Sequence, residues 1–228
     1  MPPGTPGPPD RRGRFAALLA AAAVVLAGLG TATALILDGP EPAPQAPAVT
    51  AIRTPALTYE VPTDWTQGGT SVGNILGVDF TGVARGPAYE CGGRSLVRGI
   101  AASAVLPGGV PADAMAGATA RALAEGYYTS STDGEPPEVS VSVPRAVDVG
   151  GIEGSLVEAT ARTAADDGCL ATEGVVLVLA VPVTTADGQV TALLVVNGDR
   201  AGGPGDAPPV PERAALDAIV ASARPPTI

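Results

Sequence analysis

The chain has 228 residues and a formal net charge of −10 at pH 7, with 30 glycines, 24 prolines and few aromatic residues. It contains no histidine, and all 13 of its basic residues are arginine. The absence of histidine excludes the commonest general base and metal ligand, and the absence of lysine excludes Walker-type phosphate sites and Schiff bases. We therefore expect a protein that is not an enzyme and carries neither a cofactor nor a metal centre.

Residues 1–14 are rich in proline and glycine and end in the arginine-rich sequence RRGR, so we interpret them as a disordered tail. Residues 15–37 follow without a single charge. At about 1.5 Å per residue, a helix of this length would span roughly 34 Å, enough to cross a hydrocarbon core of about 30 Å. The segment is therefore predicted to be a transmembrane helix.

A cleaved signal peptide is the alternative, with the sequence ATA at residues 32–34 as its cleavage site. Secretory apolar segments are usually about 7–15 residues long, which favours the uncleaved helix. Arginines precede the segment, whereas Asp38 and Glu41 follow it. Positive charge stays on the cytoplasmic side, so we expect a single-pass cell-membrane protein with a cytoplasmic N-terminus and an extracytoplasmic C-terminal domain. The lipid bilayer would then be a partner through this helix.

Residues 38–56 are rich in proline and alanine, which favours an extended linker. Residues 57–225 remain for the extracytoplasmic domain, a length suited to one hydrophobic core. Its first predicted elements are strands at 57–61, 75–84 and 95–106. A helix over 111–126 follows, and it carries apolar residues at helical spacing. These are Met115, Ala118, Ala122 and Leu123.

The second half of the domain is richer in strand patterns. Strands are predicted at 138–144, 154–163, 174–183 and 190–198. The third of these is continuously apolar, as expected of a strand buried on both faces. The sequence ADGQ at 186–189 predicts a hairpin turn into the next strand.

A last helix is predicted over 210–225, with Pro211 in its first turn. Its apolar face would consist of Leu216, Ile219, Val220 and Ala223. The order of strands, helix, four strands and helix predicts the α+β class, with two helices packed on a mainly antiparallel sheet.

Cys91 and Cys169 are the only cysteines. Two cysteines in one exported domain predict a disulfide, because thiols oxidise outside the cytoplasm. Closing so long a loop would stabilise the fold by at most roughly 4.5 kcal/mol. Free thiols are the alternative, whereas a catalytic thiol lacks a histidine partner and a zinc site lacks ligands.

Other candidate chemistry is weaker. GTSVG at 69–73 matches the nucleophile-elbow pattern around Ser71, but a glycine-rich hairpin fits better because no histidine base exists. Asp166 and Asp167 could touch a cation, although a solvated turn is the simpler interpretation. Trp65, the single tryptophan, is expected to plug the core.

Carboxylates offer the remaining route to catalysis. Glu60, Asp64, Asp79 and Glu90 could supply a pair for glycoside hydrolysis, although no pattern shows that any two converge. From residue 57 onward there are 20 acidic and 9 basic residues. This excess of negative charge argues against nucleic acid as a partner and disfavours binding to anionic lipid headgroups.

Three stretches, YEVPTDW, PAYECGGRSLVRG and LDAIVASARP, resemble an uncharacterised actinobacterial family of single-pass or secreted proteins, the domain of unknown function 8017. The element order is also similar to the PsbP-like sandwich of exported mycobacterial lipoproteins. The resemblance implies no established activity, so no catalytic residue is carried over.

We therefore expect a membrane-anchored, extracytoplasmic, non-catalytic binding or accessory module of the cell envelope. Its partner would be an envelope protein or a small ligand. The alternatives are an exported carboxylate-dependent hydrolase and a structural subunit of an envelope complex.

Overall fold

The computed structural model describes residues 48–68, 74–75, 78–129, 134–163, 168–185 and 188–225. The chain divides into two compact units, Met1–Ala46 and Pro47–Ile228, and all described residues belong to the second.

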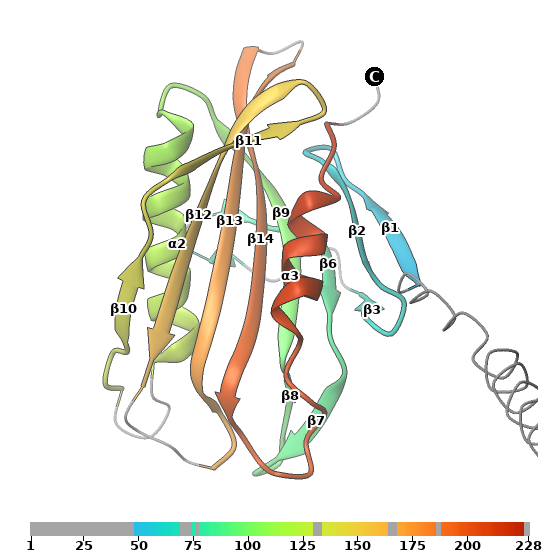
Figure 1. Cartoon of the computed structure of the whole chain (residues 1–228), viewed down its shortest axis with the longest axis vertical. Helices are drawn as coiled ribbons and strands as arrows, with labels where there is room; N and C mark the ends of the chain where they lie inside the picture. The colour runs from blue at the N-terminus through green and yellow to red at the C-terminus, as the bar shows by residue number, and fades with distance from the viewer. Residues whose placement is uncertain are drawn as a thin grey trace, which may run out of the picture. The chain divides into compact units, whose positions relative to one another are not determined.

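Strands dominate this unit (Figure 1). Those before the first helix are β1 (Val49–Arg53), β2 (Thr58–Pro62), β3 (Thr66–Gln67), β4 (Asn74–Ile75), β5 (Val78–Asp79), β6 (Thr81–Arg85), β7 (Ala88–Cys91), β8 (Arg94–Val97) and β9 (Gly99–Pro107). Those after it are β10 (Glu138–Val141), β11 (Arg145–Val149), β12 (Ile152–Arg162), β13 (Ala171–Thr185) and β14 (Gly188–Gly202). The helices are α2 (Ala112–Tyr128) and α3 (Arg213–Ala221).

The main sheet is antiparallel, with the strand order β10-β12-β13-β14-β9-β6-β3, and β11 also pairs with β12. The hairpin of β13 and β14 forms its centre, with pairing that extends from Ala171 and Gly202 to Thr185 and Gly188. Three short strand pairs, β1–β2, β4–β5 and β7–β8, are separate from this sheet.

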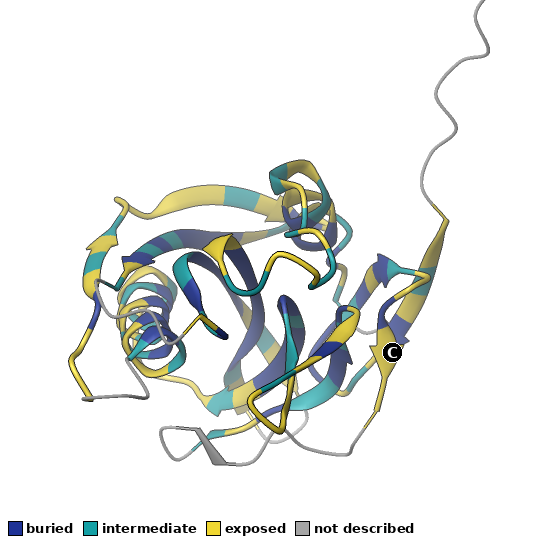
Figure 2. Cartoon of the chain, turned by 90° about the horizontal axis from the view of Figure 1, so that it is seen from below, coloured by how far each residue is buried: buried dark blue, intermediate teal, exposed yellow. Residues whose placement is uncertain are grey.

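The central strands are buried on both faces. Alternate residues of β13 point to opposite sides, so that Leu177 packs with α3 and the β1–β2 hairpin, whereas Val176 packs with α2. Figure 2 shows this as buried positions concentrated in the middle strands. The continuously apolar run of β13 is explained by these two cores, as predicted.

The predicted α+β class, a PsbP-like sandwich with two helices packed on the sheet, is wrong. Strands account for 55% of the described residues, and the two helices are short. They also cover opposite faces of the sheet. The fold is therefore a mostly antiparallel β structure.

In the described part of the chain, no helix has the length and apolar character needed to cross a membrane. The predicted span, residues 15–37, lies outside the described residues, as does the tail of residues 1–14. Strand β1 falls within residues 38–56, which were predicted to be a linker, so folded structure begins before residue 57.

Several predicted strands are broken. The range 75–84 contains the short strands β4, β5 and β6, and the range 95–106 divides into β8 and β9 at Arg98. Strands β1, β7 and β11 were not predicted, because they are short and mostly exposed, with weak apolar alternation.

The predicted apolar face of α2 is confirmed at Leu123, which is buried, and at Met115, which packs partly buried against the core, but it is wrong at the exposed Ala118. The buried residues are Ala116, Ala120, Leu123, Ala124 and Tyr128. Alanine occurs on every side of this helix, so the large residues Leu123 and Tyr128 determine which face packs on the sheet. In α3, the predicted Leu216, Ile219 and Val220 are buried, and Pro211 precedes the first turn.

Candidate functional site

The predicted disulfide is present. Cys91 at the end of β7 is bonded to Cys169, which precedes β13, with a Cα–Cα distance of 5.6 Å. Gly92 follows at φ +58°, a left-handed conformation that glycine adopts without strain, and turns the chain into β8. The Tyr89 hydroxyl donates a hydrogen bond of 2.9 Å to the Cys169 carbonyl oxygen. The β7–β8 hairpin is thereby fastened to the end of the sheet.

A cavity of about 240 Å³ lies beside this crosslink. The hairpin, the C-terminal end of α2 and the ends of β12, β13 and β14 form its walls. Its lining residues are Tyr89, Ser95, Leu96, Val97, Ile100, Tyr127, Tyr128, Thr129, Thr163, Leu170, Ala171, Asn197 and Asp199. Segments far apart in sequence therefore meet at one end of the molecule.

Tyr128 is positioned by a glycine, Gly174, on strand β13. A Cβ atom at Gly174 would overlap the Tyr128 ring, so the ring lies directly on the β13 backbone. The Tyr128 hydroxyl donates to Asn197 Oδ1 at 2.7 Å and to Asp199 Oδ1 at 3.4 Å. Burial and the nearby Asp199 raise the pKa of Tyr128, so it remains a hydrogen-bond donor at neutral pH.

Asp199 on β14 is a buried carboxylate in this wall. Desolvation raises its pKa to about 7, although the Arg98 charge and the hydrogen bond from Tyr128 oppose that shift. The ion pair with Arg98 is long, with 3.8 Å between Nη1 and Oδ2. The negative charge of the Asp199 carboxylate is therefore only partly neutralised by Arg98.

Arg98 occupies the break between β8 and β9. Its Nη1 donates to the Gly202 carbonyl oxygen at 2.9 Å, and its Nη2 donates to that of Pro204 at 3.4 Å. The guanidinium lies 5.3 Å from the centre of the Tyr89 ring. Its Nε is buried without a hydrogen-bond partner among the described residues. Arg98 thus joins the hairpin to the chain that leaves β14.

The cavity combines tyrosine rings, hydroxyl groups, an amide and one carboxylate. Ligand sites typically have this composition, an apolar surface with a few polar groups that fix orientation. Its volume is below the range of about 300–1,000 Å³ usual for drug-sized ligands. The arrangement can therefore hold a small molecule.

The residues predicted from sequence lie mostly elsewhere. Trp65 is buried in the core, as predicted, and its ring lies against Gly99. Ser71, Asp166 and Asp167 lie outside the described residues.

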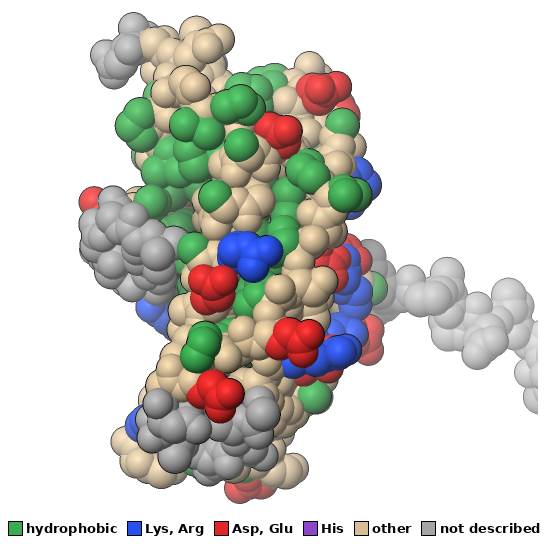
Figure 3. Space-filling view, turned by 90° about the vertical axis from the view of Figure 1, so that its left-hand side faces the viewer, with side chains coloured by type: hydrophobic (Ala, Val, Ile, Leu, Met, Phe, Trp, Pro, Cys, Tyr) green, Lys and Arg blue, Asp and Glu red, His purple; other side chains and the backbone are tan. Residues whose placement is uncertain are grey.

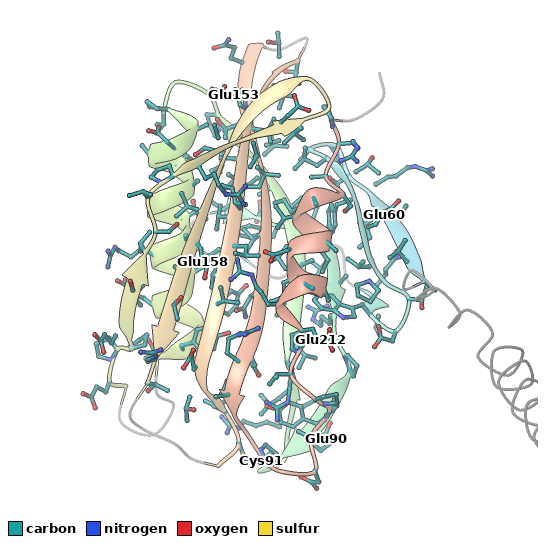
Figure 4. The ribbon with its side chains drawn as sticks, in the orientation of Figure 1. Glu60, Glu90, Cys91, Glu153, Glu158 and Glu212 are labelled. Carbon is teal, nitrogen blue, oxygen red and sulfur yellow. A yellow bond between two sulfur atoms is a disulfide. The ribbon has the colours of Figure 1, made fainter. Side chains whose placement is uncertain are left out.

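Glu60, Asp64, Asp79 and Glu90 are exposed, and none of them lines this cavity. Figure 4 shows Glu60 beside β2 and Glu90 beside Cys91, in separate parts of the molecule.

A different pair of carboxylates meets beside α3. Arg213 binds Glu158 through Nη1 and Nη2 at 3.1 and 2.8 Å, and it binds both oxygens of Asp217 through Nε at 2.9 Å. Arg213 and Asp217 border a groove of about 390 Å³ between α3 and β11. These contacts raise the pKa of Arg213 and attach α3 to β12.

A third hollow, of about 410 Å³, lies where α2 begins and β11 crosses. Figure 3 shows hydrophobic side chains gathered in the upper part of this face. Pro144 and Pro182 are among the residues that line the hollow. Among the described residues that line this hollow, there is no buried hydrogen-bond network. The cavity of about 240 Å³ beside the crosslink, called the disulfide cavity below, has such a network, and we therefore take it as the candidate site.

Four residues central to this site, Arg98, Tyr128, Asn197 and Asp199, were not predicted. Asn197 and Asp199 are polar residues that directly follow the apolar run of β14. This position could have indicated from the sequence that they belong to a site. Among the described residues, no group of three or more His, Cys, Asp or Glu side chains could hold a metal ion.

The chain has no match among curated proteins. A family model for a domain of unknown function (DUF8017) matches residues 41–227, most of its length. This range includes the whole sheet, both helices and the candidate site. The chain therefore belongs to the DUF8017 family.

Proposed function

We propose that this protein is an exported, non-catalytic binding module of the cell envelope, with its ligand site in the disulfide cavity. The observation that carries the proposal is the cavity itself, in which Tyr128, Asn197 and Asp199 present polar groups beside aromatic rings. Buried polar groups that border a hollow are the usual means of orienting a small ligand.

Export is supported by two features. The disulfide between Cys91 and Cys169 is of the kind that persists in oxidising compartments. The uncharged segment 15–37, with arginines before it, has the charge asymmetry that directs a chain out of the cytoplasm.

Binding is favoured over carboxylate-dependent hydrolysis. Such hydrolysis needs two carboxyl groups on either side of the substrate, one of them protonated. Asp199 is the one carboxylate among the described residues that line the cavity. Glu158 and Asp217 do converge, but Arg213 forms an ion pair with each of them, so both carboxylates already have a partner within the protein.

Native mass spectrometry of the full chain tests the proposal. The protein would be purified without reductant, in a detergent with no sugar headgroup, and incubated with a low-molecular-weight extract of the cell envelope. We expect a complex with one small molecule. Ser95→Trp should abolish it, because the exposed Ser95 borders the cavity and a larger side chain there would fill it.

Ser140→Trp is the matched control, because Ser140 is also an exposed strand serine but lies on β10, away from the cavity. It should bind like the unmodified protein. The proposal fails if the unmodified protein retains no small molecule, or if Ser95→Trp retains as much as Ser140→Trp.

A further inference from the structure

The charges around the cavity are balanced. Asp199 is the one charged side chain among the described lining residues, and Arg98 lies 3.8 Å from it with the opposite charge. A buried cation would therefore be repelled by Arg98, and a buried anion would be repelled by Asp199. An unpaired charge is costly to bury, so these groups favour an uncharged ligand.

Hydrogen-bonding groups surround the same space. The Asn197 Oδ1 atom accepts from Tyr128, whereas Asn197 Nδ2 donates to no side chain or carbonyl in the described part of the protein. Among the described residues, the Asp199 carboxylate has only two side-chain contacts of this kind, the long hydrogen bond from Tyr128 and the long ion pair with Arg98. The hydroxyl groups of Ser95, Thr129 and Thr163 also border the cavity. A ligand with several groups that both donate and accept would satisfy this set.

Aromatic rings complete the wall. Tyr89 and Tyr127 supply ring surface from the hairpin and from the last turn of α2. A tyrosine offers an apolar face together with a polar hydroxyl. That combination suits a compact ring with C–H faces and hydroxyl edges. The volume of about 240 Å³ limits the ligand to one such ring.

We infer that the disulfide cavity binds a small uncharged polyol, a single sugar ring or a cyclitol of similar size. This inference rests on the proposed function and specifies the class of ligand. Hydroxyl groups of the ring donate to Asp199 and accept from the Asn197 amide, and a ring face lies against a tyrosine.

Three sugars with the same ring and different charge test the inference. Glucose, 6-amino-6-deoxyglucose and glucuronate would be titrated into the full chain in sugar-free detergent at pH 7.5, with binding followed by isothermal calorimetry. Glucose should bind at least about tenfold more tightly than either charged sugar, a difference of about 1.4 kcal/mol. Myo-inositol, an uncharged ring without an anomeric centre, should bind within about tenfold of glucose.

Amino-acid substitutions test whether glucose binds in the disulfide cavity. Asn197→Leu keeps the side-chain size and removes the amide, and it should weaken glucose binding at least about tenfold. Tyr127→Leu, in a partly exposed position, is a second variant in case Asn197→Leu does not fold, and it should weaken binding by a similar factor. Glu90→Gln is the control, because Glu90 is exposed on the β7–β8 hairpin beside the cavity but does not line it.

The outcomes separate the two proposals. If no uncharged ring binds, if a charged sugar binds as tightly as glucose, or if neither variant weakens binding, this inference is overturned. The proposed function survives that result when native mass spectrometry still finds another small molecule that Ser95→Trp displaces. Both are overturned when no small molecule binds at all.

Discussion

At the scale of single residues, Asp199 is a carboxylate whose titration is strongly perturbed by burial. Its carboxylate has lost most of its hydration by burial, and Arg98 replaces that hydration only through a long ion pair. Burial therefore outweighs the charge of Arg98, and the pKa of Asp199 is raised from 3.8 to about 7. The folded protein holds a proton on Asp199 over a pH range in which the unfolded chain has released it.

Stability should therefore depend on pH in an unusual direction. The contribution of Asp199 to the free energy of unfolding is fully present below pH 3.8 and is lost as the pH rises to about 7. The loss is on the order of 4 kcal/mol, because each unit of pKa shift corresponds to about 1.4 kcal/mol.

Urea unfolding between pH 4 and 8 measures this effect when the unmodified chain is compared with Asp199→Asn. The variant cannot titrate at this position, so the stability of the unmodified protein should decrease relative to it as the pH rises. A constant difference across the range would show that Asp199 titrates normally.

At the scale of secondary structure elements, the packing of α2 on β13 depends on one glycine. Tyr128 at the end of α2 lies directly on the backbone of Gly174. This contact brings the Tyr128 hydroxyl to Asn197 and Asp199 on the neighbouring strand β14. The site is thus assembled by the packing of a helix on a strand.

Gly174→Ala should destabilise the protein by about 3 kcal/mol, because the added methyl group overpacks a buried contact. Gly117→Ala is the matched control, since Gly117 lies within α2 with open space around its Cβ position. It should be neutral or stabilising by up to about 1 kcal/mol, as alanine favours helix. Thermal unfolding of both variants checks these values, and equal effects would contradict the proposed packing.

The elements with strong periodicity could be predicted from sequence. Strands β13 and β14 and helix α3 have apolar patterns that tertiary structure reinforces, and their positions agree with prediction. The short strands β1 and β7 could not be predicted, because their pairing depends on hairpin contacts rather than on an apolar face of their own.

Most residues of the candidate site could not be predicted from the sequence. The cysteine pair was predictable from its number and compartment. Arg98 lies within an apolar run that was predicted as one strand, and Tyr128 is separated from Asp199 by most of the second half of the domain. Convergence of such residues depends on sheet order, which no local pattern specifies.

At the scale of the whole molecule, one crosslink joins two halves of the folded unit. The disulfide connects the hairpin before α2 to the strand that begins the central β13–β14 pair, across a sequence separation of 78 residues. Among the described strands, β7 and β8 pair only with each other, and the Tyr89 hydroxyl adds one hydrogen bond to the Cys169 carbonyl oxygen. The disulfide therefore holds the hairpin that carries the lining residues Tyr89, Ser95 and Leu96 next to the start of β13.

Reduction should lower the free energy of unfolding by up to about 4.5 kcal/mol, because a long loop regains its freedom in the unfolded chain. Urea denaturation with and without a phosphine reductant measures the difference. The double variant Cys91→Ser and Cys169→Ser is the control and should not respond to the reductant. An unmodified protein that is equally insensitive would show that the bond contributes no stability.

Hydrogen exchange with mass spectrometry, recorded with and without the small molecule retained in native mass spectrometry, tests the location of the ligand most directly. The account predicts slower exchange in residues 88–98, 127–129 and 195–200, which surround the disulfide cavity, and no change in residues 213–221 beside the α3 groove. Protection confined to the α3 groove, or no protection at all, would contradict it.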